Sequence, residues 1–212
     1  MRAATAPPLA ADELRLYWCD DSGDPIPRRV RLDRLLRSAL AALVGAAPAE
    51  LHFGREDRGR PFLRHPQAPD FNLSDTVGGT LIGICAAGRI GVDLERIDRQ
   101  LPVARLAARW FSAGEAAELA ALPAEAARIA FLQLWTAKEA SCKATGTGIF
   151  GQLRDWRFEA GSAAPRLLGA PQAAGAAERW RFERLSPSPA HTAVLAVLDA
   201  PPLVVSGSRL LA

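Results

Sequence analysis

Three side chains between residues 131 and 148 have the types and the spacing to do chemistry together. Trp135, Glu139 and Lys143 follow one another at intervals of four residues. On a helix this spacing puts an indole, a carboxylate and an ammonium on one face. The same pattern is also typical of an ordinary surface ion pair beside a residue anchored in the core. The choice between the two depends on what the rest of the chain brings to that face.

A second pair of carboxylates lies upstream, at the spacing of a strand. Asp93 and Glu95 flank Leu94, so an extended chain would put both carboxylates on one face and the leucine on the other. Two neighbouring acids repel each other, and Mg²⁺ compensates such a pair directly because it prefers carboxylate oxygens. The alternative is a solvated strand end with Arg96 as counter-charge.

Arginines concentrate at two places in the first third of the chain. Five of them stand within ten residues, at Arg28, Arg29, Arg31, Arg34 and Arg37, and four more at Arg55, Arg58, Arg60 and Arg64. The clusters indicate either a solvated basic face or a site for phosphates or an acidic protein. A metal ion with a lysine and arginines is the set that holds a pyrophosphate and neutralises a transferring phosphoryl group.

Several other classes of function are not supported. The Gly-rich phosphate motifs Gly-x-x-x-x-Gly-Lys-Ser/Thr and Gly-x-Gly-x-x-Gly are missing, and no nucleic-acid motif accompanies the arginines. The three cysteines form no close pair and the three histidines are scattered, which argues against a zinc site. Neither a membrane span nor the apolar core of a signal peptide occurs, so we expect a cytoplasmic protein without membrane or nucleic-acid partners.

The periodicity of the 212 residues predicts an α+β fold. We expect helices over 30–44, 102–110, 113–121 and 123–144, the third with a capping box from Ser112 to Glu115. Strands are expected over 14–18, 51–53, 156–159, 180–185 and 192–198, and residues 80–95 are expected to form a hairpin. Segment 71–76 is expected to be irregular and polar. The resemblance of 80–85 to 192–198 indicates two related halves, 1–100 and 101–212.

Five segments in this order resemble the larger, Sfp-type class of 4′-phosphopantetheinyl transferases. They are Gly59-Arg-Pro-Phe-Leu63, Phe71-Asn-Leu-Ser74, Ile90-Gly-Val-Asp-Leu-Glu95, Phe111-Ser-Ala-Gly-Glu115 and Trp135-Thr-Ala-Lys-Glu-Ala-Ser-Cys-Lys143. The resemblance covers about residues 14–200. It implies a monomer of two similar halves related by a pseudo-twofold axis, each with a helix on a small, mostly antiparallel sheet. The active site would lie in the cleft between the halves.

The resemblance also implies an activity and a set of site residues. The activity is transfer of phosphopantetheine from coenzyme A to a serine of an acyl or peptidyl carrier protein, with release of 3′,5′-ADP. Asp93, Glu95 and Glu139 would bind Mg²⁺, Glu139 would help to deprotonate the serine, and Lys143 would stabilise the pyrophosphate charge. Coenzyme A contacts are implied for Arg28, Arg37, Arg60, Pro61, Ser74, Asp75, Thr76, Lys138 and Lys143.

One position departs from the family pattern. The family commonly has Phe-Asn-x-Ser-His-Ser where this chain has Phe71-Asn-Leu-Ser-Asp-Thr76. The family histidine tends to contact the 3′-phosphate of coenzyme A, which Asp75 would repel. Either Asp75 turns to a neighbouring arginine or the contact is rebuilt, with Ser74 and Thr76 still able to donate hydrogen bonds. Two other functions stay open: a non-catalytic carrier-protein or nucleotide-binding module, and a Mg²⁺-dependent phosphohydrolase that uses Asp93 and Glu95.

Overall fold

The computed structural model describes residues 9–10, 12–20, 25–148, 152–200 and 204–209. The helices are α1 (Arg28–Val44), α2 (Val103–Trp110), α3 (Ala113–Ala120) and α4 (Ala124–Thr145). The strands are β1 (Glu13–Cys19), β2 (Phe53–Arg55), β3 (Pro61–Leu63), β4 (Asp70–Thr76), β5 (Gly79–Cys85), β6 (Arg89–Arg96), β7 (Arg157–Phe158), β8 (Leu167–Gly169), β9 (Trp180–Ser188), β10 (His191–Leu198) and β11 (Val204–Arg209). The expected α+β class is confirmed.

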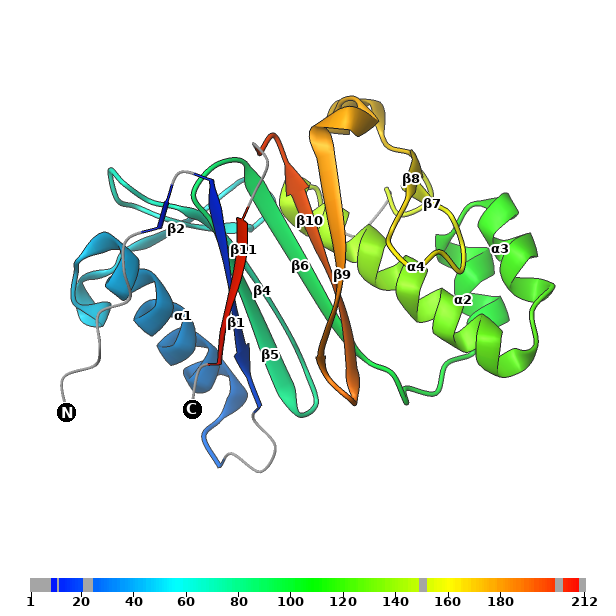
Figure 1. Ribbon diagram of the computed structural model, residues 1–212, viewed down its shortest axis with the longest axis horizontal. Helices are drawn as coiled ribbons and strands as arrows, with labels where there is room; N and C mark the ends of the chain where they lie inside the picture. Colours follow the sequence, from blue (N-terminus) through cyan, green and yellow to red (C-terminus); the bar gives the residue numbers. More distant parts are fainter. Residues whose placement is uncertain (1–8, 11, 21–24, 149–151, 201–203, 210–212) are drawn as a thin grey trace.

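Two sheets pack face to face and carry a helix on each outer side (Figure 1). The first sheet has the order β11-β1-β5-β4 and the second has the order β6-β10-β9. Apolar side chains fill the space between the sheets, with Leu81 from the first and Val92 and Leu195 from the second. The sequence of layers is therefore α1, first sheet, second sheet and α4, with α2 and α3 at the far end beyond α4 (Figure 1).

Helix α1 forms where the leucine spacing predicted it. Leu35, Leu36 and Leu40 are buried against Ile82 and Ile84 of β5, and the arginines take the other faces. The helix ends at Gly45, whose φ of 68° is the left-handed conformation that glycine adopts without steric cost. This packing holds the arginine-rich start of α1 beside the end of β4.

Helix α4 lies directly on the backbone of β6. A Cβ atom at Gly91 would stand 1.9 Å from the carbonyl oxygen of Ala140, so only glycine permits this approach. Aromatic contacts with Phe111, which follows α2, fix the rotation of α4: the Phe111 ring lies 4.8 Å from that of Phe131 and 6.4 Å from that of Trp135. Trp135 is thus the core anchor that the spacing indicated.

Strand β4 corrects the expectation of an irregular segment at 71–76. Alternate side chains of this strand bond to the backbone of β6: Asp70 accepts from the Ile90 N–H at 2.8 Å, Asn72 from Val92 at 2.9 Å and Ser74 from Leu94 at 3.2 Å. Side chains replace the backbone partners that β6 lacks on this edge, and this spaces the two sheets apart. Phe71 and Leu73 alternate with these polar residues and pack on the α1 side, but the alternation is short and ends at Ser74, so the sequence predicted no strand.

The expected hairpin over 80–95 is also wrong. Strand β5 pairs with β1 and β4, whereas β6 pairs antiparallel with β10, with Asp93 opposite Val194 and Glu95 opposite Thr192. The chain does turn at Gly88, but it passes there from one sheet to the other. Strand β11 returns to pair with β1, so strand pairing crosses the expected boundary near residue 100 at two places. That boundary stays a prediction.

Candidate active site

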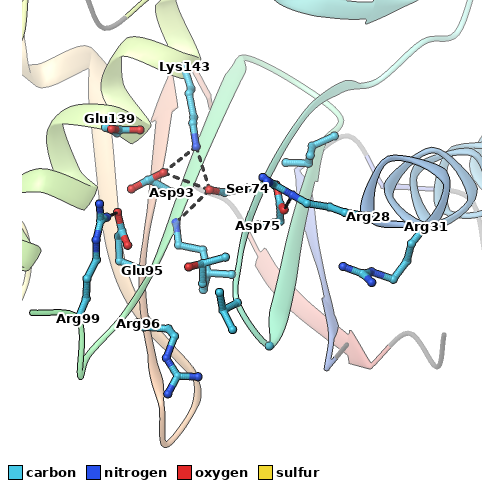
Figure 2. Close-up of a pocket in the computed structure, with 15 residues that line it drawn as sticks. Arg28, Arg31, Ser74, Asp75, Asp93, Glu95, Arg96, Arg99, Glu139 and Lys143 are labelled. Atoms are coloured by element: carbon cyan, nitrogen blue, oxygen red, sulfur yellow. Dashed lines mark hydrogen bonds and ion pairs between the residues drawn. The ribbon is translucent and has the colours of Figure 1, made fainter. Parts of the chain in front are cut away.

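A cavity of about 970 Å³ opens where β4, β6, α4 and the start of α1 meet (Figure 2). Its charged lining residues are Arg28, Arg31, Asp75, Asp93, Glu95, Arg96, Arg99, Glu139 and Lys143. All three carboxylates predicted from the sequence to bind a metal are in this set. Ser74 and Thr76 line the same cavity, so residues from four separate segments between Arg28 and Lys143 meet in one place.

Asp93 and Glu95 lie side by side on β6, as the period of two predicted. Both are buried, with exposed fractions of 3% and 8%, while Leu94 faces the core between the sheets. Oδ2 of Asp93 is buried and has no hydrogen-bond partner. Glu95 is paired with the guanidinium of Arg99. A buried carboxylate oxygen without a partner is costly unless a cation or a hydrogen-bond donor meets it.

Glu139 and Lys143 reach this pair of carboxylates from α4 (Figure 2). Nζ of Lys143 lies 2.6 Å from Oδ1 of Asp93 and donates to Oγ of Ser74 at 2.9 Å and to the carbonyl of Val92 at 3.1 Å. The helical spacing of four puts Glu139 one turn earlier on the same face. The surface-pair reading of these two residues is therefore excluded, since both point into the cavity.

The negative charge of Asp93 contributes to a raised pKa at both Glu95 and Glu139. Burial, followed by the negative charge of Asp93, raises the pKa of Glu139 to about 8, and Lys143 opposes this rise only in part. Burial also raises the pKa of Glu95, against the lowering effect of Arg99. An acid whose pKa is near 8 exchanges a proton readily at neutral pH, which is the property required of a general base.

The donor set fits a hard cation, although the side chains are not arranged around one. Within the described residues, no group of three or more His, Cys, Asp or Glu side chains is placed to hold a metal ion. Lys143 is paired with Asp93 and Arg99 with Glu95 instead. The carboxylate oxygens of the three residues and the partnerless Oδ2 of Asp93 match the chemistry of Mg²⁺ ligation.

The first of the two expectations for Asp75 is confirmed. Its carboxylate turns to Arg28, and Oδ1 lies 2.7 Å from Nη2 in a two-point contact that also joins Nε to Oδ2. The pair lies on the rim of the cavity, beside Ser74 (Figure 2). Arg28 therefore neutralises the charge of Asp75, and this weakens the repulsion between Asp75 and an incoming anion.

Four residues expected to contact coenzyme A are not brought to the cavity. Lys138 is fully buried on another side of α4, because consecutive helical residues are about 100° apart. Its ammonium lies 2.8 Å from Glu115 and bonds to the carbonyls of Leu153 and Trp156. The expected position of Lys138 was wrong. The sequence does not identify this partner, because the spacing of Ser112 and Glu115 indicates only the capping box.

The other three of these residues also lie outside the cavity: Arg60, its neighbour Pro61, and Arg37. Arg60 is buried and binds Asp70 through two nitrogens, at 2.9 and 2.6 Å, and the carbonyl of Lys143 at 2.9 Å. It thus ties β4 to the end of α4. Arg37 pairs with Asp33 and donates to two carbonyls below α1. Pro61 begins β3 and is not among the cavity residues.

Sequence reasoning missed three basic residues of the cavity as site residues: Arg31, Arg96 and Arg99. Arg31 stood in the first arginine cluster, and Arg96 was considered only as a counter-charge. No sequence pattern indicates Arg99 as a site residue, because its pairing with Glu95 crosses the end of a strand and depends on the path of the following loop.

Among the described residues, no helix is long and apolar enough to cross a membrane.

Comparison with known proteins gives a consistent family. The chain is 36% identical over 149 residues to the 4′-phosphopantetheinyl transferase HetI of Nostoc, with 66% of this chain and 61% of the relative covered. It is 36% identical over 123 residues to the 4′-phosphopantetheinyl transferase psf-1 of Bacillus pumilus, covering 58% and 52%. The chain thus spans between half and two thirds of the length of these relatives.

A solved structure of the acyl carrier protein synthase of Mycobacterium tuberculosis aligns with a TM-score of 0.34 and 24% identity, covering 53% of this chain and 97% of that one. The family model described as the 4′-phosphopantetheinyl transferase superfamily matches residues 89–197. The match spans just over half of the chain and includes Asp93, Glu95, Glu139 and Lys143. The chain therefore belongs to the 4′-phosphopantetheinyl transferase superfamily.

Proposed function

We propose that the protein transfers the 4′-phosphopantetheine arm of coenzyme A to a serine of an acyl or peptidyl carrier protein and releases 3′,5′-ADP. The observation that carries the proposal is the meeting of three carboxylates, Lys143 and a basic rim in one cavity. The relatives that share the segment are named as transferases of this kind. The reaction belongs to the holo-[acyl-carrier-protein] synthase type.

Asp93, Glu95 and Glu139 would hold a Mg²⁺ ion, whose charge would neutralise the pyrophosphate oxygens and ease departure of the nucleotide. The partnerless Oδ2 of Asp93 supports this assignment. To admit the ion, Lys143 would leave Asp93 and Arg99 would leave Glu95. Both cations would stay beside the site, so their charges would become available to the substrate.

Glu139 acts as the base in this scheme, directly or through a water molecule. It removes the proton of the carrier serine, whose oxygen forms a bond to the β-phosphorus of coenzyme A. The bond between that phosphorus and the bridging oxygen breaks, and Lys143 stabilises the charge that develops on the leaving 3′,5′-ADP or donates a proton to it. The position of Lys143, one turn from Glu139 and 2.9 Å from Ser74, supports this division of roles.

The rim around Arg28, Ser74, Asp75 and Thr76 would bind the nucleotide part of coenzyme A. The Arg28–Asp75 pair supports this role, because a balanced carboxylate orients the guanidinium without repelling a phosphate. Arg31 belongs to the same rim. The proposed coenzyme A contacts exclude four residues that do not line the cavity: Arg37, Arg60, Pro61 and Lys138.

The proposal includes the organisation expected from the resemblance. The chain would be a cytoplasmic monomer of two equivalent halves, with α1 on the first sheet corresponding to α4 on the second and the site in the cleft between them. The position of β5 and β10 at the inside of their sheets supports this equivalence.

A mass-shift assay tests the function. Apo-carrier proteins of the fatty-acid, polyketide and peptide types are incubated with coenzyme A and Mg²⁺, and each modified carrier should gain the mass of one phosphopantetheine arm. Glu139→Gln, which keeps the shape of the side chain, should fold and lose transfer by at least about a hundredfold. If no carrier gains mass, or if Glu139→Gln turns over normally, the proposal fails.

A further inference from the structure

The turn between β4 and β5, here called the Val77 turn, consists of Val77 and Gly78 and forms part of the wall of the active cavity. It follows Asp75 and Thr76, which stand on the same rim. Val77 is 76% exposed, so the packing of its side chain holds the turn only weakly. The backbone of the turn must therefore be held by contacts with other elements.

His191 reaches the Val77 turn from the other sheet. It begins β10 and is 5% exposed. Its Nε2 lies 3.0 Å from the carbonyl oxygen of Val77, and its Nδ1 lies 2.7 Å from Oγ of Ser188 in β9. The turn belongs to the first sheet and β10 to the second, and the β4–β5 and β9–β10 turns lie at the same end of the molecule (Figure 1). The imidazole ring therefore bridges the two sheets beside the cavity.

The directions of these hydrogen bonds follow from the groups involved. A carbonyl oxygen can only accept, so Nε2 of His191 donates to Val77. In the neutral ring Nδ1 then accepts from the hydroxyl of Ser188, whose oxygen accepts from the backbone N–H of Ala190 at 3.2 Å. Ser188 thus favours the tautomer that His191 needs in order to hold Val77.

Trp18 of β1 supports the same arrangement from the first sheet. Its ring lies 5.2 Å from that of His191, at an interplanar angle of 58°. A Cβ atom at Gly79, the first residue of β5, would stand 2.0 Å from the Trp18 ring, so the indole packs directly on the backbone next to the Val77 turn. A displacement of the turn would disturb the contacts of both Trp18 and His191.

We propose that His191 is a positioning residue, which holds the Val77 turn and thereby keeps the nucleotide side of the cavity in the shape that binds coenzyme A. His191 is not among the residues that line the active cavity, so it acts through the carbonyl of Val77 and not by contact with a substrate. The inference rests on the transferase function and on the assignment of the rim around Arg28 and Thr76 to coenzyme A. It predicts an effect on coenzyme A binding, and none on the carrier or on the chemical step.

Two variants separate the bond to Val77 from the rest of the side chain. The amide nitrogen of glutamine is as many bonds from Cβ as Nε2 of histidine, and that of asparagine is as many bonds as Nδ1. His191→Gln can therefore still donate to Val77, whereas His191→Asn reaches only Ser188. Both variants lose the ring that packs on Trp18, so urea unfolding should show similar losses of stability in the two.

Steady-state kinetics should distinguish the two variants. KM for coenzyme A should rise at least about fivefold in His191→Asn, as the loss of one hydrogen bond implies, and stay within about twofold of the wild type in His191→Gln. The value of kcat at saturating coenzyme A and KM for the carrier should stay within about twofold in both. His52→Asn is the matched control and should behave as the wild type, because His52 is exposed and is not a cavity residue.

Hydrogen exchange of the backbone amides of residues 76–80 tests the contact without any substrate. Exchange there should be faster in His191→Asn than in the wild type and in His191→Gln. The inference is overturned if the three proteins exchange equally, if both variants raise KM for coenzyme A to the same extent, or if only kcat falls. A wild-type enzyme that modifies no carrier refutes the proposed function, a result distinct from these, and hydrogen exchange then decides the role of His191 alone.

Discussion

Glu139 is expected to destabilise the metal-free protein at alkaline pH, so that Glu139→Gln becomes the more stable form there. The folded carboxyl has a pKa of about 8, against an ordinary value of 4.5, because of burial and the charge of Asp93. Between these two pH values the folded protein holds a proton that the unfolded chain has lost. The free energy of unfolding must therefore fall as pH rises, by up to about 1.4 kcal/mol per pH unit from this group.

The size of the effect follows from the interval between the two pKa values. An interval of about 3.5 pH units corresponds to about 5 kcal/mol at most. Because Glu139 is only half-buried, solvent screens part of the interaction, and we expect about 2–3 kcal/mol. At pH 5 the protonated Glu139 and the amide of glutamine are both neutral, so the wild type and the variant should be nearly equal in stability.

Urea unfolding measures this directly, in EDTA at half-unit steps from pH 5 to pH 8.5. The five tryptophans provide the fluorescence signal. Titrating groups outside this cluster of charges are common to both proteins and cancel in the difference. If the difference between variant and wild type does not change with pH, the reasoning about Glu139 is wrong. Addition of Mg²⁺ at pH 8 should stabilise the wild type and have little effect on the variant, since the ion would replace the proton on Glu139.

Three further predictions concern the surroundings of the site. Lys138→Met should lower the free energy of unfolding by about 3–5 kcal/mol, because it leaves the Glu115 carboxylate buried without its cation. Urea titration measures this loss, and a loss below about 1 kcal/mol would contradict the prediction. Gly91→Ala should push α4 away from β6 and reduce transfer at least about tenfold while the protein stays folded. An activity assay measures the loss of transfer, and circular dichroism checks the fold. Unchanged activity would mean that transfer does not depend on the close approach of α4 to β6. Cys85 and Cys142 should react with a thiol reagent at pH 8 only as fast as the protein unfolds, because burial raises their pKa to about 11 and about 12; rapid labelling of the native protein would refute this.

Parts of the site that depend on local periodicity could be read from the chain. A strand alternates its side chains and a helix repeats every 3.6 residues, so the shared faces of Asp93 with Glu95 and of Glu139 with Lys143 follow from spacing alone. The capping box of α3 is equally local, and Glu115 accepts from the backbone N–H of Ser112 at 3.0 Å as expected. The same holds for the helix end at Gly146, whose φ is 73°.

Parts that depend on partners distant in the sequence could not be read in this way. Strand β4 looked irregular because its polar side chains serve the backbone of β6, about twenty residues away. The family resemblance implied coenzyme A contacts for Arg60 and Lys138, and no local sequence pattern around either residue identifies its partner. In the structure both are buried, and each has a carboxylate of the chain within hydrogen-bond distance.

The chain by itself thus determined which side chains share a face: an acidic strand face on β6, an acid and a lysine on α4, and basic residues at the start of α1. Only the tertiary structure decided that these faces meet in one cavity. Packing decided it, since Gly91 lets α4 lie on β6 and the side chains of β4 hold the first sheet at a distance from β6. Such contacts join residues 20 to 70 positions apart, and no periodicity within a segment encodes them.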